Sequence, residues 1–407
     1  MFTGLKKMTV LAGFVGLAGG VAGLWLPAGS AAAADSVPLL AQAAAPALRA
    51  DPAPPADPAA APVPAQVRMA LLLPNRGGMF GAAADAVRTG FLTAYSRQKA
   101  NIQLAVIETG DTVQDMQRAY DDASAKFDIL IGPLSRSAVT AVAQSGRVSK
   151  PTIALAQPDL PAEAEAQLPP MMLTVGLSID DEARQVANWV EKEKAPGKIF
   201  AVATSVAWQK RAARSFQARA RQLGLQVETL ELTTPANALS APGLAQLARR
   251  IEQERPALIF AALDSAQAVQ LRSAVGAELP IYGTSQLNPF TLNRDNPNDK
   301  LPELDGVRLI DIPWQLEPDN VAVSRYPRPA TGENDRPNPD LARLYALGID
   351  AFRVAHEIAQ QRSGFDLDGV TGRLNVNMIG GGATYFQRQE TQAVFQNGLP
   401  VPTADQY

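Results

Sequence analysis

Val67-Arg-Met-Ala-Leu-Leu-Leu73 (VRMALLL) decides the fold class, because it is a short and almost uncharged apolar run that ends at Pro74. An apolar run of this length, bounded by a turn, is typical of a buried strand. After a glycine turn, apolar side chains return at helical spacing, at Ala84, Val87, Phe91 and Tyr95. A buried strand followed by an amphipathic helix is the unit of a parallel sheet that is covered on both faces.

The same alternation continues along the chain. Further strands are predicted at 102–107, 127–131 and 152–155, with helices at 113–126 and 136–147. The pattern then starts again with a helix near 180–194, for which Asp180 or Asp181 is the expected N-cap. Strands at 198–204, 225–230, 257–262 and 279–282 alternate with helices around 212–223, 244–251 and 265–275. We therefore predict an α/β protein with two doubly wound parallel-sheet lobes, joined by a multi-strand hinge.

The C-terminal third returns to both lobes. Polar loops rich in Pro and Asn are predicted at 284–305 and 315–339, with a strand at 307–312 between them. An amphipathic helix follows at 341–355, and then terminal strands, the last near 391–395. We predict a folded body over 67–407, with a first lobe at about 67–170 plus 284–360 and a second lobe at about 176–282 plus 361–407.

The N-terminus indicates export. Residues 1–34 have the layout of a signal peptide: Lys6 and Lys7, then the apolar stretch Thr9–Leu26, then small residues up to Ala34. The alternative is an uncleaved anchor, because about 18 apolar residues can just span a bilayer. Residues 35–66 are rich in Ala and Pro and are predicted to form an extended tether or a simple spacer. The expected location is the periplasm.

Composition excludes several classes of site. The 407 residues include no cysteine, which excludes disulfides, thiolate zinc sites, cysteine nucleophiles and lipid attachment to an N-terminal cysteine. The single histidine, His356, is interpreted as structural. With 37 basic and 40 acidic residues, bulk charge does not favour nucleic acid as a partner. Neither a phosphate-loop pattern nor a G-x-S-x-G elbow occurs. We predict no enzymatic activity, no cofactor and no metal.

Five residues are candidate contacts for a ligand or partner between the lobes, because ligands of doubly wound folds lie at loops after strands and at helix N-termini. These residues are Ser135, Ser137, Gln157, Trp208 and Asp264. The serines could hold a carboxylate or simply cap a helix. Asp264 could likewise bind an amino group or cap the helix at 265. Trp208 could stack on a ligand or cover a helix start.

Several motifs carry a resemblance to known proteins. Ala70-Leu-Leu-Leu-Pro74 and Ile131-Gly-Pro-Leu-Ser135 look like a type I periplasmic-binding-protein fold. From Val67 onward the chain also resembles the penicillin-binding-protein activator (LpoA-like) family. The pieces that match are Ile281-Tyr-Gly-Thr-Ser285, the DGVRLIDIPW motif at 305–314, the LYALGIDAF motif at 344–352 and the GVTGRL motif at 369–374.

The resemblance implies a non-enzymatic regulator that binds and stimulates a bifunctional class A penicillin-binding protein in the periplasm. Two features depart from that family. Its members are typically lipoproteins with an acylated cysteine, and the longer ones carry a helical-repeat domain where this chain has the Ala/Pro-rich segment. The loops at 284–305 and 315–339 are the first expectation for the partner contact.

The alternative function belongs to a different class: the substrate-binding protein of an ABC transporter for an amino acid or a similar small solute. Such a receptor needs a polar cleft that closes around paired ligand groups. An activator needs a persistent exposed surface, and its cleft can be filled.

Overall fold

The computed structural model describes residues 66–99, 101–160, 168–194, 196–291, 300–329, 338–378 and 384–403. The predicted signal peptide or anchor at 1–34, and the predicted tether up to residue 65, lie outside the described residues. Within these ranges, no helix has both the length and the apolar character needed to cross a membrane.

The first lobe is built on a five-stranded parallel sheet with the order β2-β1-β3-β4-β5. Its strands are β1 (Val67–Pro74), β2 (Ile102–Thr109), β3 (Ile129–Ile131), β4 (Thr152–Ala154) and β5 (Met172–Thr174). In β1, Met69 and Leu71 face one hydrophobic layer, whereas Ala70 and Leu72 face the other. Burial on both faces explains why the VRMALLL run is continuously apolar rather than alternating.

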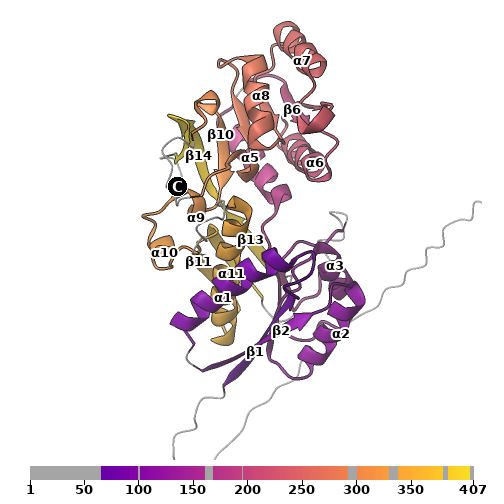
Figure 1. Cartoon of the computed structure of the whole chain (residues 1–407), viewed down its shortest axis with the longest axis vertical. Coiled ribbons are helices and arrows are strands. Elements are labelled where there is room, and N and C mark those ends of the chain that lie inside the picture. Colours follow the sequence, from indigo (N-terminus) through magenta and orange to yellow (C-terminus); the bar gives the residue numbers. More distant parts are fainter. Residues whose placement is uncertain are drawn as a thin grey trace, which may run out of the picture. The chain divides into compact units, whose positions relative to one another are not determined.

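Two pairs of helices cover this sheet (Figure 1). On one face lie α1 (Gly81–Arg97) and α11 (Pro339–Ala359), which pack side by side although they are far apart in the chain. On the other face lie α2 (Val113–Ser124) and α3 (Arg136–Gln144).

The second lobe contains a seven-stranded sheet with the order β15-β14-β10-β9-β8-β6-β7. Its parallel part comprises β6 (Ile199–Ala203), β7 (Val227–Glu231), β8 (Leu258–Ala261), β9 (Ile281–Gly283) and β10 (Arg308–Asp311). Two antiparallel strands, β14 (Thr391–Gln396) and β15 (Leu399–Pro402), complete it.

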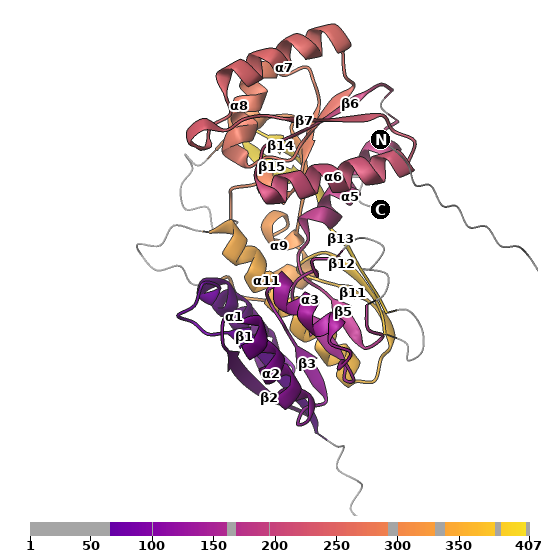
Figure 2. The same cartoon turned by 90° about the vertical axis from the view of Figure 1, so that its right-hand side faces the viewer.

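Helices also cover both faces of the second sheet (Figure 2). The layer on one face includes α5 (Ile179–Lys192) and α6 (Ala207–Gln222), and the layer on the other includes α7 (Ala241–Glu254) and α8 (Ser265–Val275). The two doubly wound lobes predicted from the alternation of strands and helices are therefore confirmed.

A small antiparallel sheet follows α11, with the order β11-β12-β13. It consists of β11 (Gly364–Asp368), β12 (Arg373–Asn377) and β13 (Tyr385–Gln389). Leu374 and Val376 of β12 belong to the core of the first lobe. The opposite face of the sheet is polar and exposed.

The sheet pairing corrects two predicted lobe boundaries. Residues 284–360 were assigned to the first lobe, but β10 pairs with β9 and β14 in the second sheet. Residues 361–407 were assigned to the second lobe, but β11–β13 pack on the core of the first. The apolar pattern of a strand shows that it is buried but not which sheet edge it joins, so spacing alone misplaced β10 and β11–β13. The helix α11 and the strands β14 and β15 do lie in the lobes predicted for them.

Smaller corrections concern local elements. Ser178, rather than Asp180 or Asp181, caps α5, and its side chain accepts a hydrogen bond from the N–H of Asp181. The stretch predicted as a loop at 315–339 overlaps the end of α9 (Pro313–Leu316) and contains α10 (Val321–Ser324). Residues 330–337 of this stretch lie outside the described residues. Short 3-10 turns lie at Pro235–Asn237, Ser285–Leu287 and Pro302–Leu304.

Candidate functional site

Ser135 and Asp264 both cap helices. Ser135 Oγ accepts a hydrogen bond from the N–H of Ala138 at 3.3 Å, at the start of α3. The carboxylate of Asp264 accepts from the N–H of Gln267 at 2.8 Å, and Gln267 Oε1 accepts in return from the N–H of Asp264. The Ser137 hydroxyl lies 3.5 Å from that of Ser135. Capping accounts for these contacts, and a ligand role for the three residues stays a prediction.

Trp208 lies half-buried in the first turn of α6. Its buried neighbour Gln209 connects the starts of two helices, since its Nε2 donates to Gln267 Oε1 at 2.7 Å. Gln209 Oε1 also accepts from the Thr204 hydroxyl at 2.6 Å. This chain of polar groups connects the start of α6, which contains Trp208, to the start of α8, which Asp264 caps.

Arg136, which lies between the two predicted serines, reaches from the first lobe to the second. Its guanidinium is 3.9 Å from Asp180 of α5 and 3.6 Å from Asp159. Asp180 is also 3.7 Å from Arg211 of α6 and accepts from the Ser215 hydroxyl at 3.0 Å. The protein's own charges therefore join the segments around Ser135 and Gln157 to the start of α5.

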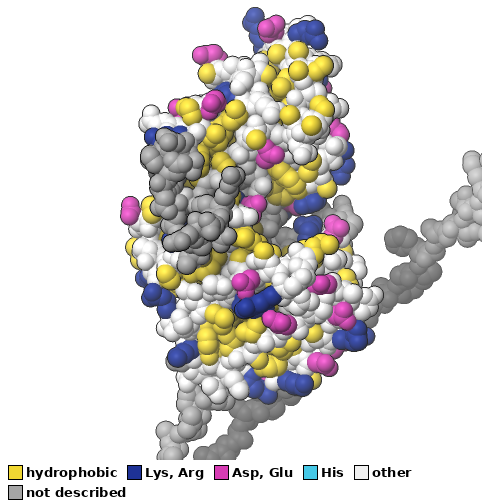
Figure 3. All heavy atoms as spheres, viewed as in Figure 1, with side chains coloured by type: hydrophobic (Ala, Val, Ile, Leu, Met, Phe, Trp, Pro, Cys, Tyr) yellow, Lys and Arg dark blue, Asp and Glu magenta, His cyan; other side chains and the backbone are white. Residues whose placement is uncertain are grey.

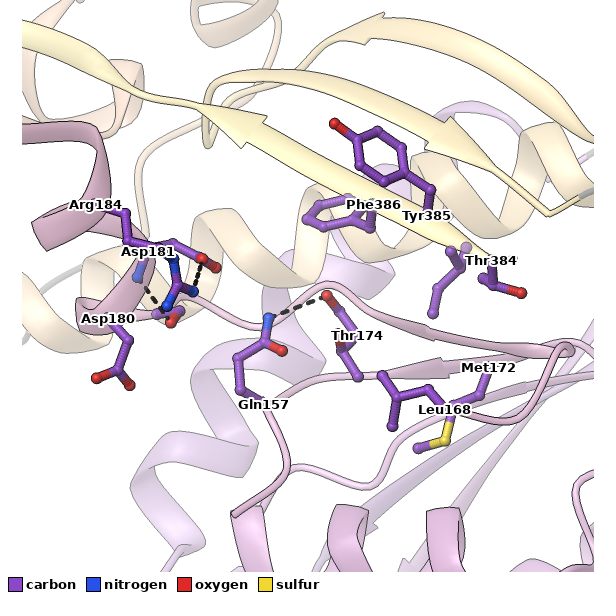
Figure 4. A pocket seen from close by; sticks show the side chains of 12 residues that line it. Gln157, Leu168, Met172, Thr174, Asp180, Asp181, Arg184, Thr384, Tyr385 and Phe386 are labelled. Atoms are coloured by element: carbon purple, nitrogen blue, oxygen red, sulfur yellow. Dashed lines mark hydrogen bonds and ion pairs between the residues drawn. The ribbon is translucent and has the colours of Figure 1, made fainter. Parts of the chain in front are cut away.

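A cavity of about 210 Å³ lies beside β5, the start of α5 and the start of β13 (Figure 4). Gln157 is the one predicted candidate among its lining residues, and its Nε2 donates to the Thr174 carbonyl at 3.2 Å. Charged groups of α5, including the Asp181–Arg184 ion pair, line one side, and Tyr385 and Phe386 line another.

A larger cavity, of about 1250 Å³, follows along the same two elements. Arg184 of α5 and Phe386 of β13 line the smaller cavity. The residues that follow them, Gln185 and Gln387, line the larger one. Further lining residues come from α9, α10 and β11. The two cavities share no lining residue. None of the five predicted candidates lines the larger cavity.

Buried charges join α11 to the second lobe. The Arg343 guanidinium donates to both carboxylate oxygens of Asp311, at 2.7 and 3.0 Å, and to the Ser285 carbonyl at 2.9 Å. The side chain of Asp311 is fully buried, and that of Arg343 is 6% exposed. A buried pair of this kind holds its geometry because either charge alone would be strongly unfavourable there.

Two buried carboxyl groups lie in the same region. Glu182 of α5 accepts hydrogen bonds from the N–H and the hydroxyl of Ser285, at 2.8 and 3.1 Å. Burial outweighs these bonds and raises the pKa of Glu182 to about 7. Burial, followed by the charge of Glu182, also raises the pKa of Glu390, between β13 and β14. Its Oε2 has no hydrogen-bond partner in the part of the chain that the structure describes.

The sequence analysis missed Glu182, Asp311, Arg343 and Glu390. A signal for two of them was available, since Asp311 interrupts an apolar strand and Arg343 lies in the helix that contains the LYALGIDAF motif. A charge inside an apolar segment requires a buried partner. Which partner it meets depends on how the two lobes join, and that does not follow from local patterns.

Among the described residues, no group of three or more His, Asp or Glu side chains could hold a metal ion. His356 Nδ1 lies 3.8 Å from Glu357, and its ring packs on Phe352, as expected for a structural histidine.

Comparison with known proteins supports the resemblance found in the sequence. A protein from Mannheimia succiniciproducens named "Penicillin-binding protein activator LpoA" is 26% identical over 341 residues. That alignment covers 82% of this chain and 55% of the relative, so the chain spans about half the length of this curated relative.

Two solved structures share the fold. The C-domain of Haemophilus influenzae LpoA, described as "a regulator of PBP1A", superposes with a TM-score of 0.64 at 20% identity, covering 83% of this chain and all of that domain. A Chromobacterium violaceum protein described as "a putative branched-chain amino acid ABC transporter" superposes with a TM-score of 0.63 at 32% identity, covering 81% and 100%. These likenesses confirm the type I periplasmic-binding-protein-like fold.

The match to a family model decides the relationship. The model, described as "LppC putative lipoprotein", matches residues 62–398, which include the small sheet and both lobes except β15. The chain therefore belongs to the LppC family.

Proposed function

We propose that this chain is a non-enzymatic regulator that binds and activates a peptidoglycan synthase, a bifunctional class A penicillin-binding protein. The observation that carries the proposal is the similarity over both lobes to proteins named penicillin-binding protein activators. The proposed place of action is the periplasm, where such a synthase polymerises glycan. Activation requires that the chain bind the active conformation of the synthase more tightly than the inactive one.

The contacts between the lobes support this proposal. Arg136 joins the segments around Ser135 and Gln157 to Asp180 of α5, so a contact between the lobes lies beside these predicted candidates. A solute receptor must separate such contacts in order to open. A regulator can keep them and use an outer surface.

The second candidate is a solute-binding protein of an ABC transporter, favoured by the similarity to the Chromobacterium violaceum structure. Under this alternative, Ser135, Ser137, Gln157, Trp208 and Asp264 are the proposed ligand contacts. The carboxylate end of an amino acid would meet the serines, and its amino group would meet Asp264.

A glycan polymerisation assay tests the proposal. A purified class A penicillin-binding protein from the same organism is incubated with lipid II, with and without the full chain. We expect faster polymerisation with the chain present, and no polymerisation by the chain alone. An unchanged rate together with thermal stabilisation of the chain by an amino acid would favour the solute receptor instead.

A further inference from the structure

We propose that a proton shared between Glu182 and Glu390 sets the angle between the two lobes, so that the connections between the lobes form a hinge that responds to pH. The inference goes beyond the proposed function and does not rest on it. It concerns a movement of the chain itself and applies to a regulator and to a solute receptor alike.

Three buried acidic residues lie at the passages between the lobes. Within the described residues, the chain passes between the lobes from β5 to α5, from β10 to α9 and from β13 to β14. Glu182 lies in the first turn of α5, Asp311 is the last residue of β10, and Glu390 is the one residue between β13 and β14. A hinge absorbs the movement of rigid lobes in a few residues at the ends of elements. A movement of the lobes would therefore change the surroundings of these acids first.

The helix α5 brings Glu182 and Glu390 together. Gln185 lies three residues after Glu182, and its Oε1 accepts from the N–H of Glu390 at 3.0 Å. Residues three apart in a helix share one face. Glu390 is thus held against the face of α5 that carries Glu182. In agreement, burial and then the charge of Glu182 raise the pKa of Glu390.

Arg388 of β13 holds the first and third passages together. Its buried guanidinium donates to the Val175 and Gly176 carbonyls, at 2.6 and 3.1 Å, and to the Thr371 hydroxyl at 3.1 Å. Val175 and Gly176 lie between β5 and α5, whereas Arg388 is two residues before Glu390. The bonds of Arg388 to uncharged groups therefore connect the two passages.

The positive charge near the two acids is enough for one carboxylate. Among the described residues, neither Glu182 nor Glu390 forms an ion pair with a lysine or arginine, and Arg388 forms none with an acid. The other charged groups of the region are the ion pairs Arg343–Asp311, Arg353–Asp350 and Arg184–Asp181, and Glu317, which accepts from the Thr391 hydroxyl. Each pair is neutral as a whole, and Glu317 adds a negative charge. Arg388 can balance one of the two carboxylates, so the other keeps a proton in the described arrangement.

A rise in pH removes this proton and leaves two like charges in a buried site, which is unfavourable. On the surface that Figure 3 draws, acidic side chains are interspersed with basic ones, and water stabilises their charges. A change of the lobe angle that admits water to the hinge gives Glu182 and Glu390 the same stabilisation. Burial raises the pKa of Glu182 to about 7, so we expect the change of angle near pH 7.

Fluorescence energy transfer between the lobes tests this inference. The chain has no cysteine, so Gln114→Cys on α2 and Ala218→Cys on α6 attach one dye to an exposed position of each lobe. The distance between the dyes is measured on single molecules of the full chain from about pH 4 to pH 8.5.

Two further proteins carry the same dyes. The hinge variant, Glu182→Gln with Glu390→Gln, keeps both side chains neutral at every pH. The matched control, Glu191→Gln with Glu252→Gln, removes two acidic groups from α5 and α7 outside the passages.

We expect the mean distance in the labelled chain to change by more than about 2 Å, with a midpoint near pH 7. The hinge variant should keep the low-pH distance throughout the series. The control should follow the labelled chain.

A constant distance in the labelled chain would overturn the inference even where the melting temperature depends on pH, because protons would then bind without moving the lobes. A midpoint near 4.5, the ordinary value for a glutamate, would overturn it too, and this result needs no variant. A hinge variant that still changes its distance near pH 7 would exclude Glu182 and Glu390 as the cause. None of these results bears on synthase activation, so failure of the proposed function remains a separate outcome.

Discussion

Gly90 of α1 and Gly348 of α11 lie where the backbones of the two helices touch. A Cβ atom on Gly90 would lie 1.9 Å from the Tyr345 carbonyl oxygen, and one on Gly348 would lie 2.1 Å from the Val87 carbonyl oxygen. Neither position has room for a side chain. The two glycines therefore set the distance between the helices that cover one face of the first sheet.

Replacing Gly348 by alanine tests this packing. Inside a helix, alanine is more favourable than glycine by about 1 kcal/mol. The new methyl group, however, must push α11 away from α1. We expect a net loss of about 1–3 kcal/mol in the free energy of unfolding, measured by urea denaturation. Gly364→Ala is the control, since a Cβ atom on Gly364 would lie 4.0 Å from its nearest neighbour, the Val376 carbonyl oxygen. A Gly348→Ala protein as stable as the unmodified chain would contradict the packing argument.

The buried Arg343–Asp311 pair predicts a second stability effect. Arg343→Met leaves Asp311 as an unpaired charge in a fully buried position, which should cost about 3–5 kcal/mol. The double variant Arg343→Met with Asp311→Leu should recover much of that loss, because no uncompensated charge remains.

An exposed ion pair provides the comparison. Arg68 and Asp128 lie 2.9 Å apart, with side chains 49% and 40% exposed. Arg68→Met should cost about 1 kcal/mol or less. Urea denaturation of the three variants measures these differences. Equal losses for Arg343→Met and Arg68→Met would show that the Arg343 pair is not buried as described.

Much of the fold could be predicted from the sequence because its units are local. The apolar run of β1 and the helical spacing of Ala84, Val87 and Phe91 depend only on neighbours in the chain, and both elements are found. The position of β10 depends on pairing with β9 and β14, which local patterns do not encode. The predicted lobe boundaries therefore needed correction although the strand itself was expected.

The candidate site was harder to predict for the same reason. Reasoning from strand ends and helix starts selected Ser135 and Asp264, whose local role as caps is visible in the structure. Glu182 and Arg343, by contrast, both bond to Ser285, which lies 103 residues from the first and 58 residues from the second in sequence. No spacing rule connects such residues until the lobes are assembled.

The raised pKa of Glu182 predicts that stability depends on pH. The folded chain keeps a proton on Glu182 up to about pH 7, whereas the unfolded chain loses it near the ordinary value of 4.5. Between these values the folded state binds more protons, so the free energy of unfolding falls as pH rises. With about 1.4 kcal/mol per pKa unit, the shift from 4.5 to about 7 corresponds to a loss of about 3–4 kcal/mol above pH 7. Glu390, whose pKa is also raised, acts in the same direction.

Glu182→Gln is the matched variant, because its amide oxygen can accept from the N–H of Ser285 while its NH2 group donates to the Ser285 hydroxyl oxygen. Thermal unfolding of both proteins is followed from about pH 4.5 to pH 7.5. We expect the melting temperature of the unmodified chain to fall more steeply with pH than that of the variant. Parallel curves would mean that Glu182 titrates normally in the folded protein.

Substitutions of Asp264 distinguish its role as a helix cap from a role as a ligand contact. Asparagine caps helices as well as aspartate does, whereas alanine at this position should cost about 1 kcal/mol of stability. If Asp264 only caps α8, Asp264→Asn should match the unmodified chain both in stability and in synthase binding. If it binds an amino group, the Asn variant should stay stable but lose the stabilisation that an amino acid confers in a thermal-shift series. The capping box with Gln267 favours the first outcome, because the carboxylate already accepts a hydrogen bond at 2.8 Å.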